Sequence, residues 1–297
     1  MAIIGVDIGG THFRIGVVDE ALQVSHFERL AVGDIIHPAD PLGDLAAFLS
    51  AYISRADLAP EAIVLGFPAT VDKDRSTVLQ APNLPFLENL PVKEALSRRL
   101  SVPVLLERDV NLTLYYDRKY YGLEQQEIVV AIYFGTGIGN AVMIHQQLLL
   151  GKNGVAAELG HIPVAGSTIP CGCGNVGCME NLAGGKYLAH LQKSHFPGTP
   201  IDAMFTRHGS SPEIKAMLRH MAMTIATEAN IFDPDCILIG GGVPSMPDFP
   251  WGALVEETLS HTRKPFPAAT LQLLHSEDFP EKGIIGAALY AKALLSL

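Results

Sequence analysis

Short apolar runs that end in glycine or proline alternate with helical patterns along the chain. In the first half, Ile3–Gly10 and Ala62–Pro68 are apolar and contain several β-branched residues, which is typical of buried strands. Apolar side chains recur at helical intervals in Pro41–Arg55 and in Val92–Leu100. Two further strands are expected at Phe13–Asp19 and Val102–Asp109. The alternation predicts a mixed α/β fold.

The second half continues this alternation. An apolar strand–turn–strand covers Ile128–Ile144, and another buried strand runs through Cys236–Gly242. Helices are expected at Lys215–Phe232, at Trp251–Thr262 and at the alanine-rich Gly283–Leu295.

Two strand–turn–strand segments, Asp7–Val18 and Tyr133–Ile144, share one design: an apolar strand, a turn rich in glycine and threonine, and a second apolar strand. Two lobes of similar construction would explain the likeness. The alternative is two unrelated hairpins that each need glycine for a positive φ. The two-lobed hypothesis gives an N-terminal lobe of residues 1–115, with helix 283–297 packing back onto it, and a C-terminal lobe of residues 116–282.

Composition and charge argue against several classes of protein, including nucleic-acid-binding and membrane proteins. The chain has 297 residues, of which 48% are hydrophobic and 18% are charged, as in compact soluble proteins. The formal net charge of −10 and the lack of a dense basic run argue against nucleic acid as a partner. The N-terminus does not resemble a signal peptide, and glycines interrupt the most apolar later stretch, so no membrane span is expected. We therefore expect a cytoplasmic protein with reduced thiols.

Three glycine-rich turns follow predicted strands, at Asp7–Thr11, Gly135–Gly139 and Ile239–Val243. Glycine lets backbone N–H groups approach an anion closely, and phosphate is the usual occupant of such turns. A Walker motif is absent, and the second turn lacks the last glycine of the dinucleotide-binding fingerprint. The three turns together favour a nucleotide-phosphate site of another type.

Two aspartates stand at the ends of predicted strands. Asp7, beside the first glycine turn, can position Mg²⁺ for phosphoryl transfer. Asp109 can accept a proton from an attacking hydroxyl group. The alternatives are that Asp7 caps a turn and that Asp109 caps the N-terminus of a following helix.

Other polar residues suit a polyhydroxylated ligand. An amide, two carboxylates and an imidazole are supplied by Asn83–Pro85, Ala157–His161 and Glu180. Such a set suits a sugar, because each sugar hydroxyl needs both a hydrogen-bond donor and an acceptor. The alternative for each of them is an ordinary polar group at the surface.

One histidine and three of the four cysteines form the pattern H-x₉-C-x-C-x₄-C, at His161, Cys171, Cys173 and Cys178. Three thiolates and one imidazole complete a tetrahedral Zn²⁺ site without an open position, so the metal is expected to be structural. Free reduced thiols are the alternative. Because this loop lies between Glu158 and Glu180, the metal would hold two candidate ligand carboxylates in place.

Together these motifs resemble the ROK family (repressor, open reading frame, kinase) of sugar kinases from end to end. The resemblance rests on DIGGTHFRIG, PNLP, RDVN, FGTGIG, ELGHIPV followed by CGCGNVGCME, and LIGGGV. It implies the two-lobed, actin-like (ribonuclease H-like) ATPase fold of hexokinases, with a cleft between the lobes. Repressors of the family carry a DNA-binding segment before the first phosphate turn, and none is expected here because that turn begins at Asp7.

The resemblance also implies a role for each candidate. Asp109 would be the general base that removes the proton of the sugar hydroxyl. Asp7 and the first two turns would hold Mg²⁺ and the ATP phosphates, and the third turn would lie along the adenosine. The turn residues are Gly9, Gly10, Thr11, Gly135, Thr136, Gly137, Gly240, Gly241 and Gly242. The sugar ligands would be Asn83, Glu158, His161 and Glu180, with His161 also bound to zinc.

Two departures from the family pattern bear on the sugar. Many glucose-specific members have asparagine directly before the catalytic aspartate, whereas this chain has Arg108, which offers five donors and no acceptor. Arg108 is therefore a candidate substrate residue, and the alternative is that it points away and pairs with Glu107 or another acid. Ala69 similarly stands where many relatives have glycine. The combination of GFPA, PNLP, RDVNL, and FDPD followed by LIGGGV resembles D-allose kinases more than glucokinases or fructokinases.

The expected function is ATP- and Mg²⁺-dependent phosphorylation of the 6-hydroxyl of an aldohexose, with D-allose as the first candidate. Glucose, fructose, mannose and N-acetylmannosamine are alternative substrates within the family. A sugar sensor without turnover is the alternative from another class. The expected partners are the hexose and ATP, and the resemblance suggests a homodimer.

Overall fold

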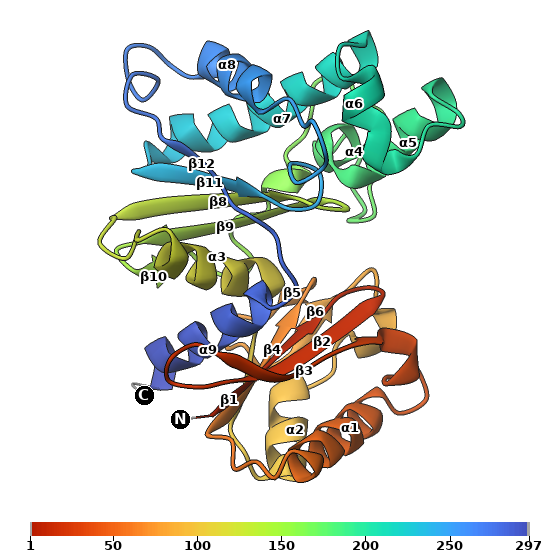
Figure 1. Ribbon diagram of the computed structural model, residues 1–297, viewed down its shortest axis with the longest axis vertical. Coiled ribbons are helices and arrows are strands. Elements are labelled where there is room, and N and C mark those ends of the chain that lie inside the picture. The colour runs from red at the N-terminus through yellow and green to blue at the C-terminus, as the bar shows by residue number, and fades with distance from the viewer. Residues whose placement is uncertain (1, 296–297) are drawn as a thin grey trace. The chain divides into compact units, whose positions relative to one another are not determined.

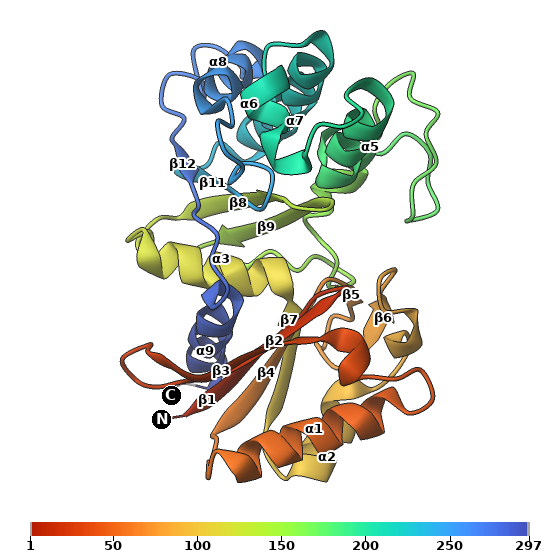
Figure 2. The same ribbon diagram turned by 45° about the vertical axis from the view of Figure 1, so that its right-hand side comes forward.

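The computed structural model describes residues 2–295, which divide into two compact units (Figures 1 and 2). Unit 1 comprises the chain up to Gly122, the segment Leu150–Ala156 and the chain from Phe279 on. Unit 2 comprises Leu123–Leu149 and Ala157–Asp278. The predicted boundary after residue 115 falls inside helix α3 (Asp109–Tyr120), which the structure keeps whole in unit 1.

The sheet of unit 1 has the strand order β3-β2-β1-β4-β7. The strands are β1 (Ile3–Ile8), β2 (His12–Val18), β3 (Val24–Ala31), β4 (Ala62–Phe67) and β7 (Val104–Arg108). The first three pair antiparallel, whereas β1, β4 and β7 run parallel to one another. The sequence pattern indicated all of these strands except β3, an edge strand in which half of the residues are polar and all are half-exposed or exposed.

Helices cover both faces of this sheet (Figure 1). Helices α1 (Pro41–Arg55) and α2 (Val92–Leu100) lie on one face, and α3 and α9 (Lys282–Leu295) lie on the other. Successive side chains of β1 point to opposite faces of the sheet. On one face, Ile4, Val6 and Ile8 join one buried core with apolar residues of α1 and α2. The opposite face of β1 meets the backbone of α9.

The sheet of unit 2 repeats this design with the strand order β10-β9-β8-β11-β12. The strands are β8 (Ile128–Phe134), β9 (Ile138–Ile144), β10 (Gln147–Leu148), β11 (Cys236–Gly240) and β12 (Leu273–His275). Again the first three pair antiparallel and the others parallel, so the strand order and directions match those of unit 1. The predicted likeness between the two strand–turn–strand segments is thereby confirmed.

Unit 2 also contains the long helices expected from the sequence, α7 (Pro212–Phe232) and α8 (Trp251–His261), which pack against each other. The pattern did not predict the short helices α4 (Glu180–Ala183), α5 (Gly185–His195) and α6 (Met204–His208). The remaining short elements are β5 (Thr70–Val71), β6 (Val78–Gln80) and 3₁₀ turns at Val32–Asp34, Pro85–Leu87, Leu159–His161 and Ile201–Ala203. In residues 2–295, none of the helices combines the length and apolarity needed to cross a bilayer.

Helix α9 approaches its neighbours in unit 1 closely through glycine. A Cβ atom on Gly286 would lie 2.0 Å from the carbonyl oxygen of Leu112 in α3, and one on Gly5 would lie 2.6 Å from the carbonyl oxygen of Ile284. Side chains at these two positions would therefore force the helix away from both β1 and α3.

We expect Gly286→Ala to destabilise the protein by about 1–3 kcal/mol, because overpacking outweighs the better helix propensity of alanine, which is worth about 1 kcal/mol. Urea unfolding followed by circular dichroism measures the change. The matched control is Gly252→Ala in α8, where a Cβ would meet no atom within 4 Å. Equal stability of the two variants would contradict the packing described here.

Candidate active site

Asp109, the predicted general base, and Asp7, predicted to position Mg²⁺, lie at the same edge of the unit 1 sheet. Asp7 is near the carboxyl end of β1, and Asp109 follows β7 directly. Strands β1, β4 and β7 are parallel, so their carboxyl ends meet at one edge, where α/β sheets usually bind ligands. A negative charge on Asp7 at this edge raises the pKa of Asp109.

Asp109 is the first residue of α3, and its Oδ1 accepts a hydrogen bond of 2.8 Å from the backbone N–H of Val110. Burial, followed by the Asp7 charge, raises the pKa of Asp109 to about 7. The Val110 N–H and the Arg108 charge oppose this rise without cancelling it. A carboxylate with a pKa near neutrality is suited to accept a proton during catalysis.

Sequence reasoning missed Arg14, the cross-strand partner of Asp7. Its Nη1 lies 2.6 Å from Asp7 Oδ2, and the two residues are paired in the β1–β2 register. That register was the available signal, since β1 and β2 were both predicted. Two carboxylates at one strand edge supply the hard oxygen atoms that Mg²⁺ prefers, so Asp7 and Asp109 fit this ion.

The first glycine turn lies beside the predicted sugar ligand Asn83. The Gly9 N–H donates to the His12 carbonyl at 2.8 Å, which closes the turn. A Cβ on Gly10 would lie 3.0 Å from the Cβ of Asn83. Thr11 and Asn83 are both exposed. The structure thus brings the turn, Asn83 and Asp7 into one region of unit 1.

Arg108 is almost fully buried, and its guanidinium donates to the carbonyl of Ala156 at 3.0 Å. Its backbone N–H donates to Glu107 Oε1 at 2.8 Å. The side-chain ion pair of Glu107 is formed with a different arginine, Arg75, whose Nε lies 2.9 Å from Glu107 Oε2. One N–H group of Arg108 is therefore committed to the segment Leu150–Ala156.

In unit 2, the second and third glycine turns lie against each other. They follow the parallel strands β8 and β11, and the Val243 N–H donates to the Phe134 carbonyl at 2.9 Å. Gly241 has a φ of +93°, and a Cβ there would lie 2.7 Å from the Phe134 carbonyl group. Only glycine combines this conformation with this contact, so the Gly240–Gly242 turn can lie directly beside Gly135.

The turn Gly135–Gly137 is further held by α5 and by Glu180. The N–H groups of Gly185 and Lys186 donate to the carbonyls of Gly135 and Thr136 at 2.7 and 2.9 Å. The Glu180 Oε2 accepts from the Ile138 N–H at 3.0 Å and would lie 2.0 Å from a Cβ on Gly137. The predicted sugar ligand Glu180 therefore also supports the predicted phosphate turn.

The three cysteines and His161 converge in unit 2. Their ligand atoms all lie within 4.8 Å of one another. The Cys173 and Cys178 sulfurs are 3.6 Å apart, as are the Cys171 sulfur and His161 Nδ1. Zn–S bonds of about 2.3 Å at tetrahedral angles separate two sulfurs by about 3.8 Å, so the cluster fits a zinc ion.

The other nitrogen of His161 faces the predicted sugar ligand Glu158. Nε2 lies 3.7 Å from Glu158 Oε2, whereas Nδ1 faces the cysteines. A histidine that binds a metal through one nitrogen commonly directs the other to a carboxylate. The cluster therefore orients His161 with respect to Glu158.

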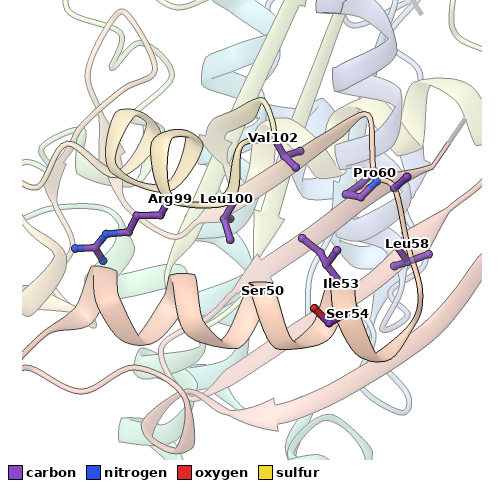
Figure 3. Close-up of a pocket in the computed structure, with 9 residues that line it drawn as sticks. Ser50, Ile53, Ser54, Leu58, Pro60, Arg99, Leu100 and Val102 are labelled. Atoms are coloured by element: carbon purple, nitrogen blue, oxygen red, sulfur yellow. The ribbon is translucent and has the colours of Figure 1, made fainter.

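A separate hollow of about 360 Å³ opens between α1 and α2 (Figure 3). Its lining includes Ile53 and Ser54 of α1, Leu58 of the following loop, Leu100 at the end of α2, and Val102 shortly before β7. These residues lie at the amino ends of β4 and β7. Asp7 and Asp109 lie at the carboxyl ends, so this hollow is not part of the candidate active site.

Two matched α/β sheets, each with a glycine turn after its first strand, define the class of two-lobed, actin-like ATPases. Residues 3–294 match the model of the ROK family, and the chain belongs to that family. It is 27% identical to a glucokinase of Thermotoga maritima, with 98% of each chain covered, and 32% identical over 265 residues to a glucokinase of Streptomyces coelicolor, with 81% of each covered. A crystal structure of a ROK family glucokinase from Streptomyces griseus in complex with glucose and AMPPNP is similar, with a TM-score of 0.81, 27% identity, and 99% of this chain and 100% of that chain covered. The fold implied by the resemblance is confirmed.

We expect Asp109→Asn to stabilise the protein, increasingly so as the pH rises from about 4 to 7. The raised pKa means that the folded state holds this proton more tightly than the unfolded state does, so wild-type stability falls as pH rises toward the folded pKa. Asparagine does not titrate, and the gain should reach about 1–3 kcal/mol above pH 7. Urea unfolding of both proteins at several pH values measures it. A difference that does not vary with pH would show that Asp109 ionises normally.

We expect one zinc ion per chain, and we expect Cys173→Ser to lose most of it, because the closed site needs all four ligands. The thermal midpoint should fall at the same time, since metal binding stabilises the folded loop. Elemental analysis and a thermal scan measure both. Cys236→Ala is the control, because this buried thiol lies in β11 outside the cluster. Unchanged zinc content in Cys173→Ser would remove Cys173 from the site.

Proposed function

We propose that the protein is an ATP- and Mg²⁺-dependent hexose kinase that transfers the γ-phosphoryl group of ATP to the 6-hydroxyl of an aldohexose. The observation that carries this proposal is Asp109, a carboxylate with a pKa raised to about 7, beside Asp7 at the carboxyl edge of the unit 1 sheet. Membership of a family that includes glucokinases and N-acetyl-D-glucosamine kinases supports it.

Asp109 acts as the general base in this proposal. The hydroxyl oxygen bonds to the γ-phosphorus while its proton passes to the Asp109 carboxylate. The bond between the γ-phosphorus and the bridging oxygen of ADP breaks, and ADP leaves with that electron pair. The hydrogen bond from Val110 fixes one carboxylate oxygen, which orients the other toward the substrate.

The ATP phosphates are bound by backbone N–H groups of the turns Gly9–Thr11 and Gly135–Gly137, and the adenosine lies along Gly240–Gly242. Mg²⁺, held through Asp7, supplies charge neutralisation at the transferring phosphoryl group. The structure supports these assignments for unit 2 by placing the second and third turns against each other.

The sugar is bound by Asn83, Glu158, His161 and Glu180. A structural zinc ion on His161 and the three cysteines holds the loop that carries the last three of these residues. The His161–Glu158 contact of 3.7 Å and the bond from Ile138 to Glu180 support a loop whose carboxylates are fixed before the sugar binds.

D-Allose is the first substrate that we propose. The replacement of asparagine by Arg108 and the presence of Ala69 support it, because a donor-only guanidinium favours a different pattern of hydroxyls from that of glucose. Glucose is the second candidate, favoured by the 32% identity with the Streptomyces coelicolor glucokinase. A buried hydrogen bond to one hydroxyl is worth a factor of roughly 10² or more in kcat/KM.

The test is ADP release with Mg·ATP across D-allose, D-glucose, D-mannose, D-fructose and N-acetyl-D-mannosamine. We expect the highest kcat/KM for D-allose, and we expect Asp109→Asn to lower kcat by roughly 10²–10⁴-fold while ATP still binds. A preference for another sugar retains the kinase and rejects D-allose. Turnover of the variant at the wild-type rate would exclude Asp109 as the base. Sugar binding without ADP release in the wild type would favour a sensor.

A further inference from the structure

A buried ion pair involves Glu107, which precedes the candidate base by two residues. The Nε of Arg75 donates to Glu107 Oε2 at 2.9 Å, and their side chains are only 9% and 1% exposed. Arg75 comes from the loop between β5 and β6, and Glu107 lies in β7 two residues before Asp109. Neither residue has a role in the proposed chemistry, yet removing two charges from water is costly unless the geometry is well satisfied.

The second oxygen of Glu107 holds the junction between β7 and α3. Glu107 Oε1 accepts from the Arg108 backbone N–H and from Asn111 Nδ2, both at 2.8 Å. These two donors flank Asp109 in the sequence. The carboxylate therefore fixes the backbone on both sides of the candidate base, and the direction of the Asp109 side chain depends on that backbone.

The other end of the Arg75 guanidinium binds backbone carbonyls. Its Nη1 donates to Asp72 and to Gly154, both at 2.9 Å, and to Val71 at 3.2 Å. Gly154 belongs to Leu150–Ala156, the segment of unit 1 whose neighbours on both sides in sequence belong to unit 2. Arg75 thus links this segment to the strand that precedes Asp109.

Gly154 allows the close approach that this link requires. Its φ is +81°, and a Cβ there would lie 2.8 Å from the Arg75 Nη1 and from the backbone of Lys73. A side chain would displace the segment from the β5–β6 loop. The guanidinium is buried, and the residue at position 154 has no side chain that would displace it. The position of the segment relative to Arg75 is therefore closely defined.

Lysine could not replace this arginine. A guanidinium presents separate N–H groups in a fixed plane, so that one group binds the carboxylate while another binds carbonyls on the far side. An ammonium is a compact charge on a flexible stem and would have to give up one end of the link.

We propose that Arg75 is a positioning residue for Asp109, acting through Glu107, and that the same guanidinium holds the segment Leu150–Ala156 on unit 1. The inference rests on the proposed function for its effect on catalysis, whereas the link itself is independent of that function. Arg75 is expected to affect transfer to the sugar and to leave nucleotide binding unchanged.

Arg75→Lys tests the catalytic part. We expect kcat for the preferred sugar to fall by roughly 10–100-fold, since a displacement of about 1 Å in catalytic groups has effects of this size. The Kd for Mg·ATP, measured by calorimetry, should change less than about twofold. The matched control is Arg219→Lys, whose Nε lies 2.8 Å from Glu257 in an exposed pair. Wild-type kcat and KM in Arg75→Lys, with the wild type active, would overturn the inference and leave the kinase proposal standing.

Gly154→Ala tests the same link from its other end. We expect the same loss of kcat, and the double variant should lose no more than the larger single loss, because both changes break one connection. Gly198→Ala is the control, since Gly198 has a φ of +83° and a Cβ there would meet no atom within 4 Å. Full additivity of the two losses would show that Arg75 and Gly154 act separately and would overturn the link.

Hydrogen exchange measured by mass spectrometry tests the link without any turnover. In Arg75→Lys, peptides covering 104–112 and 150–156 should exchange at least several-fold faster than in the wild type, whereas peptides of β11 should not. This result would support the positioning role even if no sugar were phosphorylated. Unchanged exchange in both regions would overturn it, whatever the activity.

Discussion

The close packing of α9 on β1 and α3 is the constraint on which unit 1 depends. Gly5 and Gly286 let the helix backbone come within contact distance of its neighbours, where any side chain would collide with a carbonyl group. The helix then begins at Lys282, whose ammonium lies 2.7 Å from the buried Asp117 of α3. Because α3 starts at Asp109, the packing of its later turns fixes the axis along which the candidate base is presented. Gly283 follows Lys282 and lies against Asp7, so the last helix of the chain reaches the first strand at the site itself.

The charges at this edge of the sheet differ around the two aspartates, and the surroundings of Asp109 raise its pKa. Asp7 forms an ion pair with Arg14, whose Nη1 lies 2.6 Å from Asp7 Oδ2. Asp109 receives no comparable direct ion pair in the contacts described, and burial together with the Asp7 charge raises its pKa to about 7. Arg108 is close enough to lower that pKa, but its guanidinium is engaged with Ala156. Two aspartates in similar positions at strand ends are thereby suited to different tasks.

The sequence allowed the fold and most of the candidate site to be predicted, because both depend on local patterns. The α1 and α2 boundaries, the buried strands and the repeated strand–turn–strand follow from periodicity and glycine positions. The H-x₉-C-x-C-x₄-C spacing likewise predicted a cluster that the structure brings together. Arg75 and the segment Leu150–Ala156 could not be predicted. Their contact joins positions 79 residues apart, and nothing in the local pattern of either indicates the other. β3 was missed because an edge strand with polar residues on both faces lacks the alternation that identifies buried strands.

In unit 2 the cysteine cluster and the glycine turns are parts of one arrangement. Cys178 is followed after one residue by Glu180, whose carboxylate binds the N–H of Ile138 at the end of the Gly135–Gly137 turn. On the other side of the cluster, His161 directs one nitrogen to the cysteines and the other to Glu158. A bound metal would therefore restrain a carboxylate on each side of the loop, and through Glu180 it would also restrain the turn. A zinc ion bound by the three cysteines and His161 would have no open position for a reactive group, so it would act only by fixing the residues around it.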